Sequence, residues 1–314
     1  MVLPELVEEY IAYKQSLGAS FKNASVRLRA FMAQVGEIRI EEVTAKQVRC
    51  FLDGRHGPTS LYWFSKHNSL NTFFRYARER GYLKHCPMPK AMPRKPAPST
   101  PYIYSVDEVK QLLDAADSRH QDDWLLEPHT VRTLILLLYG TGLRISEATR
   151  LKFDDADLEE QILTIRETKF CKSRLVPVGD DLAQALRQYQ HSQWASWETT
   201  DKSTFLSCRQ RQPIKHQTAR LVFKRLREAT EITRDDGAKF QPRLHDFRHT
   251  FAVTRLVTWY REGKNVQRLL PHLSTYLGHA RLGDTSRYLK MTKELMQEAS
   301  QCFERYSLTE TPDD

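Results

Sequence analysis

Residues 129–155, HTVRTLILLLYGTGLRISEATRLKFDD, set the class of fold. Their first half is strongly apolar and stops at Gly142, which is the pattern of a buried helix that ends at glycine. The second half leads into QILTIRETKF (161–170) and CKSRLVPVG (171–179), in which apolar and polar residues alternate as in strands. We therefore predict a mixed unit that is mainly helical and contains a small hairpin sheet.

Helical patterns account for most of the chain after residue 101. The run SVDEVKQLLDAAD (105–117) begins with Ser105 as the expected N-cap, and Glu108 three residues later completes a capping box. Apolar residues recur at helical spacing farther along, and the acidic tail ETPDD is expected to be disordered. Further helices are expected at 181–194, 216–230, 246–263 and 293–307.

The chain before residue 87 is predicted to be all-helical. Ser20 or Asn23 is the expected cap of the second helix, and Thr44 is the expected cap of the third. Helices are expected at 3–18, 20–36, 45–55 and about 59–81.

The last of these helices carries both aromatic and basic residues. Arg75, Arg78 and Arg80 are expected on its exposed face, where Arg75 and Arg78 could contact DNA. Its aromatic side chains could stack on bases, but their helical spacing favours packing in a core. These aromatic residues are Tyr62, Phe64, Phe73, Phe74 and Tyr76.

A proline-rich stretch, PMPKAMPRKPAPSTP, separates the two parts of the chain. Its six prolines disfavour a helix and favour an extended connector. Lys90, Arg94 and Lys95 either lie along a phosphate backbone or only keep the connector soluble. The predicted divisions are a helical domain (1–87), a linker (88–101) and a second domain (102–314).

Positive charge is concentrated in the N-terminal third. Of the 48 Lys+Arg and 39 Asp+Glu residues, 16 and 8 fall in residues 1–101, so the net charge is +8 there and +1 in the rest. This favours a polyanionic partner, although a solvated basic face has the same composition. The five scattered cysteines fit a reducing cytosol, and we expect no signal peptide and no membrane span.

Five short motifs carry residues suited to phosphoryl transfer on DNA. Guanidinium groups can hold the oxygens of a phosphodiester, and a histidine and a lysine can move protons at the attacking and leaving oxygens without a metal. Taken alone, each residue is more often an ordinary surface or core residue. The motifs are TGLRISE with Arg144, ETKFCKSR with Lys169, LHDFRHT with His245 and Arg248, YLGHA with His279, and TSRYLKMT with Tyr288.

Together these motifs resemble those of the tyrosine recombinases, also called the phage integrase family. The matching stretches are GLRISE, TK-x-x-K-x-R-LVP, HDFRHTFA and LGH, followed by a tyrosine nine residues after that histidine. They keep the family's order, and the helical first part and the linker match its layout. The resemblance implies a mainly α catalytic domain with a small β-sheet (α+β), preceded by an all-α, SAM-like core-binding domain.

The resemblance also implies a role for each matched residue. Tyr288 would attack the scissile phosphate and form a 3′-phosphotyrosine, while Arg144 and Arg248 would hold that phosphate. Lys169 would protonate the leaving 5′ oxygen, since it occupies the first lysine position of the motif. No cofactor is implied.

The remaining motif residues have lesser implied roles. His245 would accept the tyrosine proton, and His279 would hydrogen-bond the phosphate. Lys172 and Arg174 would contact the DNA backbone or support the hairpin, and Glu147 would be structural or support the site.

The resemblance implies that the protein closes around double-stranded DNA at specific recombination sites. Four protomers, identical or mixed with partner recombinases, would exchange strands through a Holliday junction in the cytoplasm, at the nucleoid. The helix at about 293–306 would dock on a neighbouring protomer or fold back on its own domain.

One stretch departs from compact Xer proteins. The segment that ends in PHLSTYLGH is longer than theirs and favours a mobile-element recombinase over Xer-like dimer resolution. Two histidines near it, His249 and His272, are interpreted as packing residues or as supports for the site. Two hypotheses compete with a recombinase: a type IB topoisomerase and a non-catalytic DNA-binding accessory protein.

Overall fold

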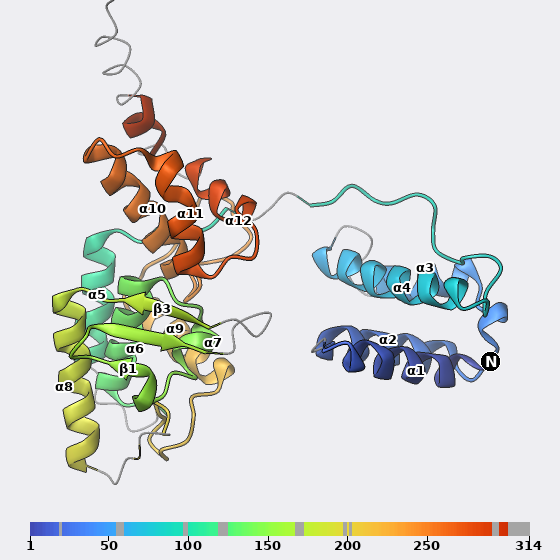
Figure 1. The fold of residues 1–314 in the computed structure, drawn as a ribbon, viewed down its shortest axis with the longest axis horizontal. Coiled ribbons are helices and arrows are strands. Elements are labelled where there is room, and N and C mark those ends of the chain that lie inside the picture. Colours follow the sequence, from blue (N-terminus) through green and yellow to red (C-terminus); the bar gives the residue numbers. More distant parts are fainter. Residues whose placement is uncertain are drawn as a thin grey trace, which may run out of the picture. The chain divides into compact units, whose positions relative to one another are not determined.

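The computed structural model describes residues 1–18, 21–54, 60–96, 100–118, 125–166, 173–196, 200, 203–290 and 295–300. The chain forms two compact units, Met1–Pro98 and Ser99–Asp314, which we describe separately (Figure 1). Among the described residues, no helix is both long enough and apolar enough to cross a bilayer.

The first unit is helical throughout its described part. Helix α4 packs against the other three helices, and its Phe73 and Phe74 are fully buried at the centre of the core. Thr44 caps α3 and forms a capping box with Gln47, as predicted. The helices are α1 (Leu3–Ser16), α2 (Lys22–Val35), α3 (Ala45–Asp53) and α4 (Leu61–Glu79), with a short 3₁₀ turn at Ile40–Glu42.

Two sequence predictions for this unit need correction. Asn23 is not a cap, because α2 begins at Lys22 after Phe21, whose ring packs edge-on against Tyr10 at 5.5 Å. The other candidate cap lies outside the described residues. Tyr62 is not a core residue, since half of it is exposed on α4.

The second unit combines helices with a small sheet. It contains α5 (Val106–Asp117), α6 (Pro128–Thr141), α7 (Ile145–Ala148), β1 (Ala156–Asp157), β2 (Ile162–Ile165), β3 (Arg174–Pro177), α8 (Asp180–Ser196), α9 (His216–Ala229), α10 (Asp246–Arg261), α11 (Val266–Leu277) and α12 (Gly283–Ser286). Two 3₁₀ turns lie at Phe153–Asp155 and Arg287–Lys290, and residues 295–300 are helical.

Helix α6 is the centre of the second unit. It packs against α5, α8 and α10, so it needs apolar residues on nearly every side. It ends at Gly142, which takes a left-handed conformation with φ +62°. This turn delivers Arg144 to the start of α7.

The sheet has three antiparallel strands in the order β1-β2-β3 (Figure 1). The predicted hairpin is confirmed, with Leu163 opposite Val176, both fully buried. The two-residue strand β1 was not predicted, because a run that short has no alternation to detect.

Helix α11 was also missed by the sequence reading. Its buried residues Val266, Leu270, Leu273 and Leu277 follow helical spacing, but Pro271 within it resembles a helix breaker. The helix packs against α10 and β3, and its core cluster includes Tyr288. Helices α10, α11 and α12 lie together at one end of the unit (Figure 1).

Candidate active site

Arg248 lies at the centre of the site. It is on the first turn of α10 and is only 2% exposed, so its charge is almost completely removed from water. Its Nη1 donates to the carbonyl of Gly142 at 2.9 Å, and its Nη2 donates to the carbonyl of Leu277 at 2.5 Å. Burial, and then the nearby charge of Arg144, lower the pKa of Arg248 to about 10, so it stays protonated at neutral pH.

Arg144 reaches the same place from the start of α7. Its Nη2 donates to the carbonyl of Gly278 at 2.9 Å, and its Nη1 pairs with Glu147 Oε1 at 2.7 Å. Glu147 also accepts from the backbone N–H of Arg144 at 3.0 Å, which fixes the turn and the side chain together.

Glu147 connects Arg144 to Arg174 on β3. The Glu147 side chain is 2% exposed, and its Oε2 pairs with Arg174 Nη2 at 2.9 Å. Burial alone would raise the pKa of Glu147, but the hydrogen bonds and charges of Arg174 and Arg144 outweigh it and lower the pKa to about 2. The carboxylate is therefore ionised at all physiological pH values.

The C-terminal end of α11 collects all three arginines. Arg174 Nε donates to the carbonyl of Tyr276 at 2.7 Å, and Arg248 and Arg144 bind the next two carbonyls, those of Leu277 and Gly278. These carbonyls carry the negative end of the helix dipole, so they stabilise clustered guanidinium groups. The cluster leaves a site with strong local positive charge.

Two glycines make this arrangement possible. Gly142 and Gly278 both have left-handed φ values, +62° and +66°. A Cβ atom on Gly142 would lie 2.7 Å from the Phe251 ring, and one on Gly278 would lie 2.8 Å from Arg174 Nη1. Only glycine fits both the backbone and the space there.

Tyr288 lies against this cluster. It is 2% exposed, and its ring stacks on His279 at 6.1 Å between centroids and tilts against His249 at 5.5 Å. Burial raises the pKa of Tyr288, whereas the charges of Arg248 and Arg287 and a hydrogen bond from Arg248 act to lower it. The phenol is thus neutral before substrate binds, and it is surrounded by groups that favour its ionised form.

The two predicted site histidines are held near the arginines in a neutral state. His279 is half-buried, and its Nδ1 lies 2.6 Å from the hydroxyl of Thr285. Burial, followed by Arg248 and Arg144, lowers the pKa of His279 to about 4. His245 precedes α10 and has an exposed edge, yet partial loss of hydration and the charge of Arg248 also lower its pKa.

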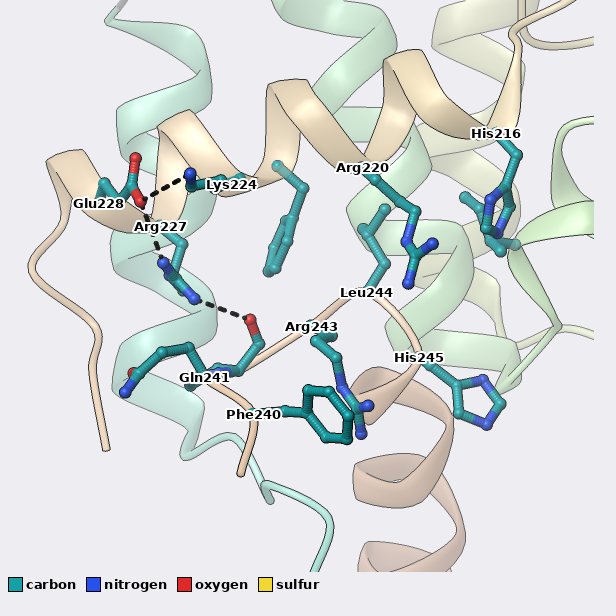
Figure 2. Close-up of a pocket in the computed structure, with 13 residues that line it drawn as sticks. His216, Arg220, Lys224, Arg227, Glu228, Phe240, Gln241, Arg243, Leu244 and His245 are labelled. Carbon is teal, nitrogen blue, oxygen red and sulfur yellow. Dashed lines mark hydrogen bonds and ion pairs between the residues drawn. The ribbon is translucent and has the colours of Figure 1, made fainter. Parts of the chain in front are cut away.

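A basic cavity opens beside His245 (Figure 2). It has a volume of about 720 Å³ between α9 and residues 240–245. Its walls combine the apolar Phe223 and Leu244 with six basic side chains and one acid. The basic residues are His216, Arg220, Lys224, Arg227, Arg243 and His245.

The sequence reading missed this cavity, although α9 carried a signal for it. Arg220, Lys224 and Arg227 recur at i, i+4 and i+7, which places them on one face of a helix. Glu228 pairs with both Lys224 and Arg227, and Arg227 donates to the carbonyl of Pro242 across the cavity (Figure 2).

The structure places the other predicted site residues as follows. Lys169 and Lys172 lie outside the described residues. Arg174 is engaged with Glu147 and the end of α11, which favours the hairpin-supporting alternative. In the first unit, the five basic residues predicted to contact DNA are all exposed: Arg75, Arg78, Lys90, Arg94 and Lys95. No group of three or more metal-ligating side chains occurs within the described part of the chain.

Known proteins similar in sequence cover most of the chain. The family model described as the phage integrase family matches residues 104–294. A Sinorhizobium fredii protein named as an integrase/recombinase, y4rE, is 34% identical over 300 residues, with 95% of each chain covered. The tyrosine recombinase XerA of Thermococcus kodakarensis is 30% identical over 234 residues, which are 74% of this chain and 72% of XerA.

Solved structures share the fold. The Tn1549 transposon integrase in complex with a circular intermediate DNA aligns with a TM-score of 0.72 over 97% of this chain and 99% of that one, at 18% identity. A lambda integrase dimer bound to a COC′ core site aligns with a TM-score of 0.63 over 90% and 96%, at 19% identity. With the family match over residues 104–294, these findings show that the chain belongs to the phage integrase family, the tyrosine recombinases, which are enzymes that cleave and rejoin DNA strands.

Proposed function

We propose that the protein is a site-specific DNA recombinase whose nucleophile is Tyr288. The observation that carries this proposal is the meeting of five motif residues, from segments up to 144 positions apart, around one cluster of positive charge. Electrostatic interactions couple Arg144, His245, His279 and Tyr288 to the buried Arg248. An anionic phosphodiester is the substrate such a site would bind.

The proposed chemistry is an in-line displacement at a DNA phosphate. The Tyr288 oxygen bonds to phosphorus, the bond to the 5′ oxygen breaks, and the DNA strand is held as a 3′-phosphotyrosine. Arg144 and Arg248 neutralise the charge that develops on the non-bridging oxygens. Lys169 protonates the leaving oxygen, and His279 hydrogen-bonds the phosphate. His245 is the terminal acceptor of the tyrosine proton.

The basic surfaces support DNA as the partner. The cavity beside His245 would hold backbone phosphates next to the cleavage point, with Arg220 and Lys224 from α9. The first unit would act as a SAM-like core-binding domain, with Arg75 and Arg78 on α4 and Lys90, Arg94 and Lys95 after it contacting DNA. Lys172 would add a contact from the hairpin.

The proposed assembly is a tetramer on two DNA sites. Lambda integrase has been solved as a tetramer bound to a Holliday junction, and its fold matches with a TM-score of 0.64. Four copies of this chain, or copies paired with partner recombinases, would exchange strands in the same kind of intermediate.

Integration, excision or transposition of a mobile element is the proposed biological role. The likeness to the Tn1549 transposon integrase and to y4rE supports it. The similarity to XerA favours dimer resolution as the second candidate. Recombination of paired sites cloned from the DNA flanking the gene would distinguish the two, since mobile-element ends should recombine only in the first case.

The direct experiment compares the wild type with Tyr288→Phe on a nicked suicide substrate. The wild type should accumulate a covalent protein–DNA adduct, and the variant should bind the DNA with unchanged affinity but form none. Adducts that persist in the variant would remove Tyr288 from its role. Relaxation of a plasmid that lacks recombination sites would instead indicate a topoisomerase.

A further inference from the structure

His249 is a buried histidine that the chemistry described above does not use. It lies on α10 one turn after His245 and is 7% exposed. Its Nδ1 is buried and has no hydrogen-bond partner within the described residues. A polar atom buried without a partner costs free energy, so it calls for a functional reason.

The ring of His249 contacts two residues of the site at once. Its centroid lies 5.5 Å from that of Tyr288 and 4.8 Å from that of His245, to which it is nearly perpendicular at 83°. Among the described residues, no ring contact or hydrogen bond joins His245 directly to Tyr288. His249 therefore lies between the nucleophile and its proposed proton acceptor.

We propose that His249 relays the proton of Tyr288 to His245 during strand cleavage. The inference rests on the proposed role of Tyr288 as nucleophile. As the Tyr288 oxygen bonds to phosphorus and the bond to the 5′ oxygen breaks, the phenolic proton moves to one ring nitrogen of His249. The proton on its other ring nitrogen moves to His245. His249 ends neutral as the opposite tautomer, and His245 ends positively charged.

The surroundings of His249 suit this role. The charged or titratable groups around it are Arg243 and His245 before α10, Arg248 on α10, and Arg287 and Tyr288 from the last 3₁₀ turn. Burial, then His245 and the arginines, lower the pKa of His249 to about 3. The ring is therefore neutral at neutral pH and has one donor and one acceptor nitrogen, which a relay needs.

Binding of the DNA phosphate would make His245, the last group of the relay, a stronger base. In the free protein, lost hydration and the charge of Arg248 lower the pKa of His245. A phosphodiester bound between Arg144 and Arg248 adds a negative charge beside His245, and this charge raises the pKa again. Proton acceptance would thus be coupled to DNA binding.

The test uses single-turnover cleavage of the nicked substrate by the full chain. His249→Gln keeps a polar side chain but cannot take up and pass on a proton, so cleavage should slow about 100-fold, the scale of lost general base catalysis. DNA affinity and melting temperature should stay close to those of the wild type. His272→Gln, the same change at an exposed histidine on α11, is the matched control and should cleave normally.

Two further readouts separate a relay from a packing role. In His249→Gln the cleavage rate should keep rising with pH, because hydroxide must then remove the phenolic proton, whereas the wild type levels off. Combining His249→Gln with His245→Ala should slow cleavage no more than the slower single variant, since both act in series on one proton.

Several results would overturn the proposal. The first is a cleavage rate of His249→Gln within threefold of the wild-type rate. The second is a rate loss that is explained by an equal loss of DNA affinity. The third is a double variant with His245→Ala whose rate loss is the product of the two single losses. His249→Phe keeps the ring volume and should show the same rate loss; failure of both variants to fold would assign His249 to packing. Absence of any wild-type adduct would instead refute the role of Tyr288.

Discussion

Replacing Glu147 by glutamine should destabilise the second unit substantially. Glu147 is the only acid in contact with Arg144 and Arg174 among the described residues, and its side chain is 2% exposed. Its pKa of about 2, against an ordinary 4.5, corresponds to about 3 kcal/mol of stabilisation at neutral pH. Loss of one partner from a buried ion pair typically costs about 3–5 kcal/mol, which agrees.

The pH dependence of this effect follows from the direction of the shift. Because the folded-state pKa of Glu147 lies below its ordinary value, the stabilisation is complete above about pH 4.5 and is lost as the pH falls towards 2. The difference in unfolding free energy between the wild type and Glu147→Gln should therefore be constant near neutrality and shrink under acid conditions.

Calorimetry of the full chain would measure the effect. A loss of about 3 kcal/mol should lower the melting temperature of the second unit by about 6–12 °C, given its size. Glu159→Gln, at an exposed position just before β2, is the matched control and should melt like the wild type. A melting temperature for Glu147→Gln within about 2 °C of the wild type would refute the reasoning.

Three further predictions concern other parts of the site. Gly142→Ala should destabilise the second unit more than Gly237→Ala. Both glycines have left-handed φ values, so alanine at either position should cost about 1–2 kcal/mol of backbone strain, but only at Gly142 would the Cβ also meet Phe251. Equal losses of unfolding free energy in chemical denaturation would contradict the packing argument. The free energy of unfolding should fall by about 1 kcal/mol between pH 7 and 5.5 from His249 alone, because its folded-state pKa is lowered and the unfolded chain binds the proton first. The unfolding free energy of His249→Gln should therefore depend less on pH than that of the wild type. The same pH dependence in both proteins would contradict this prediction. Lys169→Ala should cleave slowly, and a 5′-phosphorothiolate substrate, whose leaving group needs no proton, should restore the rate; failure to restore it would point to Lys172 or another acid.

The sequence motifs named candidate residues that the structure brings together, but they did not predict how these side chains are held. Arg144, Arg248 and Tyr288 stand in short local motifs, and the resemblance of these motifs to the family's marked them as candidates. The backbone carbonyls at the end of α11 that bind Arg144 and Arg174 lie more than 100 residues from them in the sequence. A carbonyl has no sequence signature, and Pro271 hid the helix that presents them.

The errors in the first unit have a similar cause. Phe21, rather than a polar residue, stands at the start of α2 because its ring packs on Tyr10. Tyr62 has helical spacing with the buried aromatics of α4, yet it lies half exposed near the helix start. Local propensity and spacing were outweighed by contacts made across the fold.

The basic face of α9 is visible in the sequence pattern but was not predicted to form part of a site. Arg220, Lys224 and Arg227 follow one helical face, and the partner of that face, residues 240–245, comes just before the motif that holds His245. Only the folded chain brings the two segments together as one cavity (Figure 2).

The most direct test is to identify the amino acid that becomes joined to DNA. After reaction with the suicide substrate and digestion, mass spectrometry should find a nucleotide linked through a 3′ phosphate to the peptide that contains Tyr288, and to no other peptide. A nucleotide attached to a different residue, or complete strand cleavage with no attached peptide, would contradict the account.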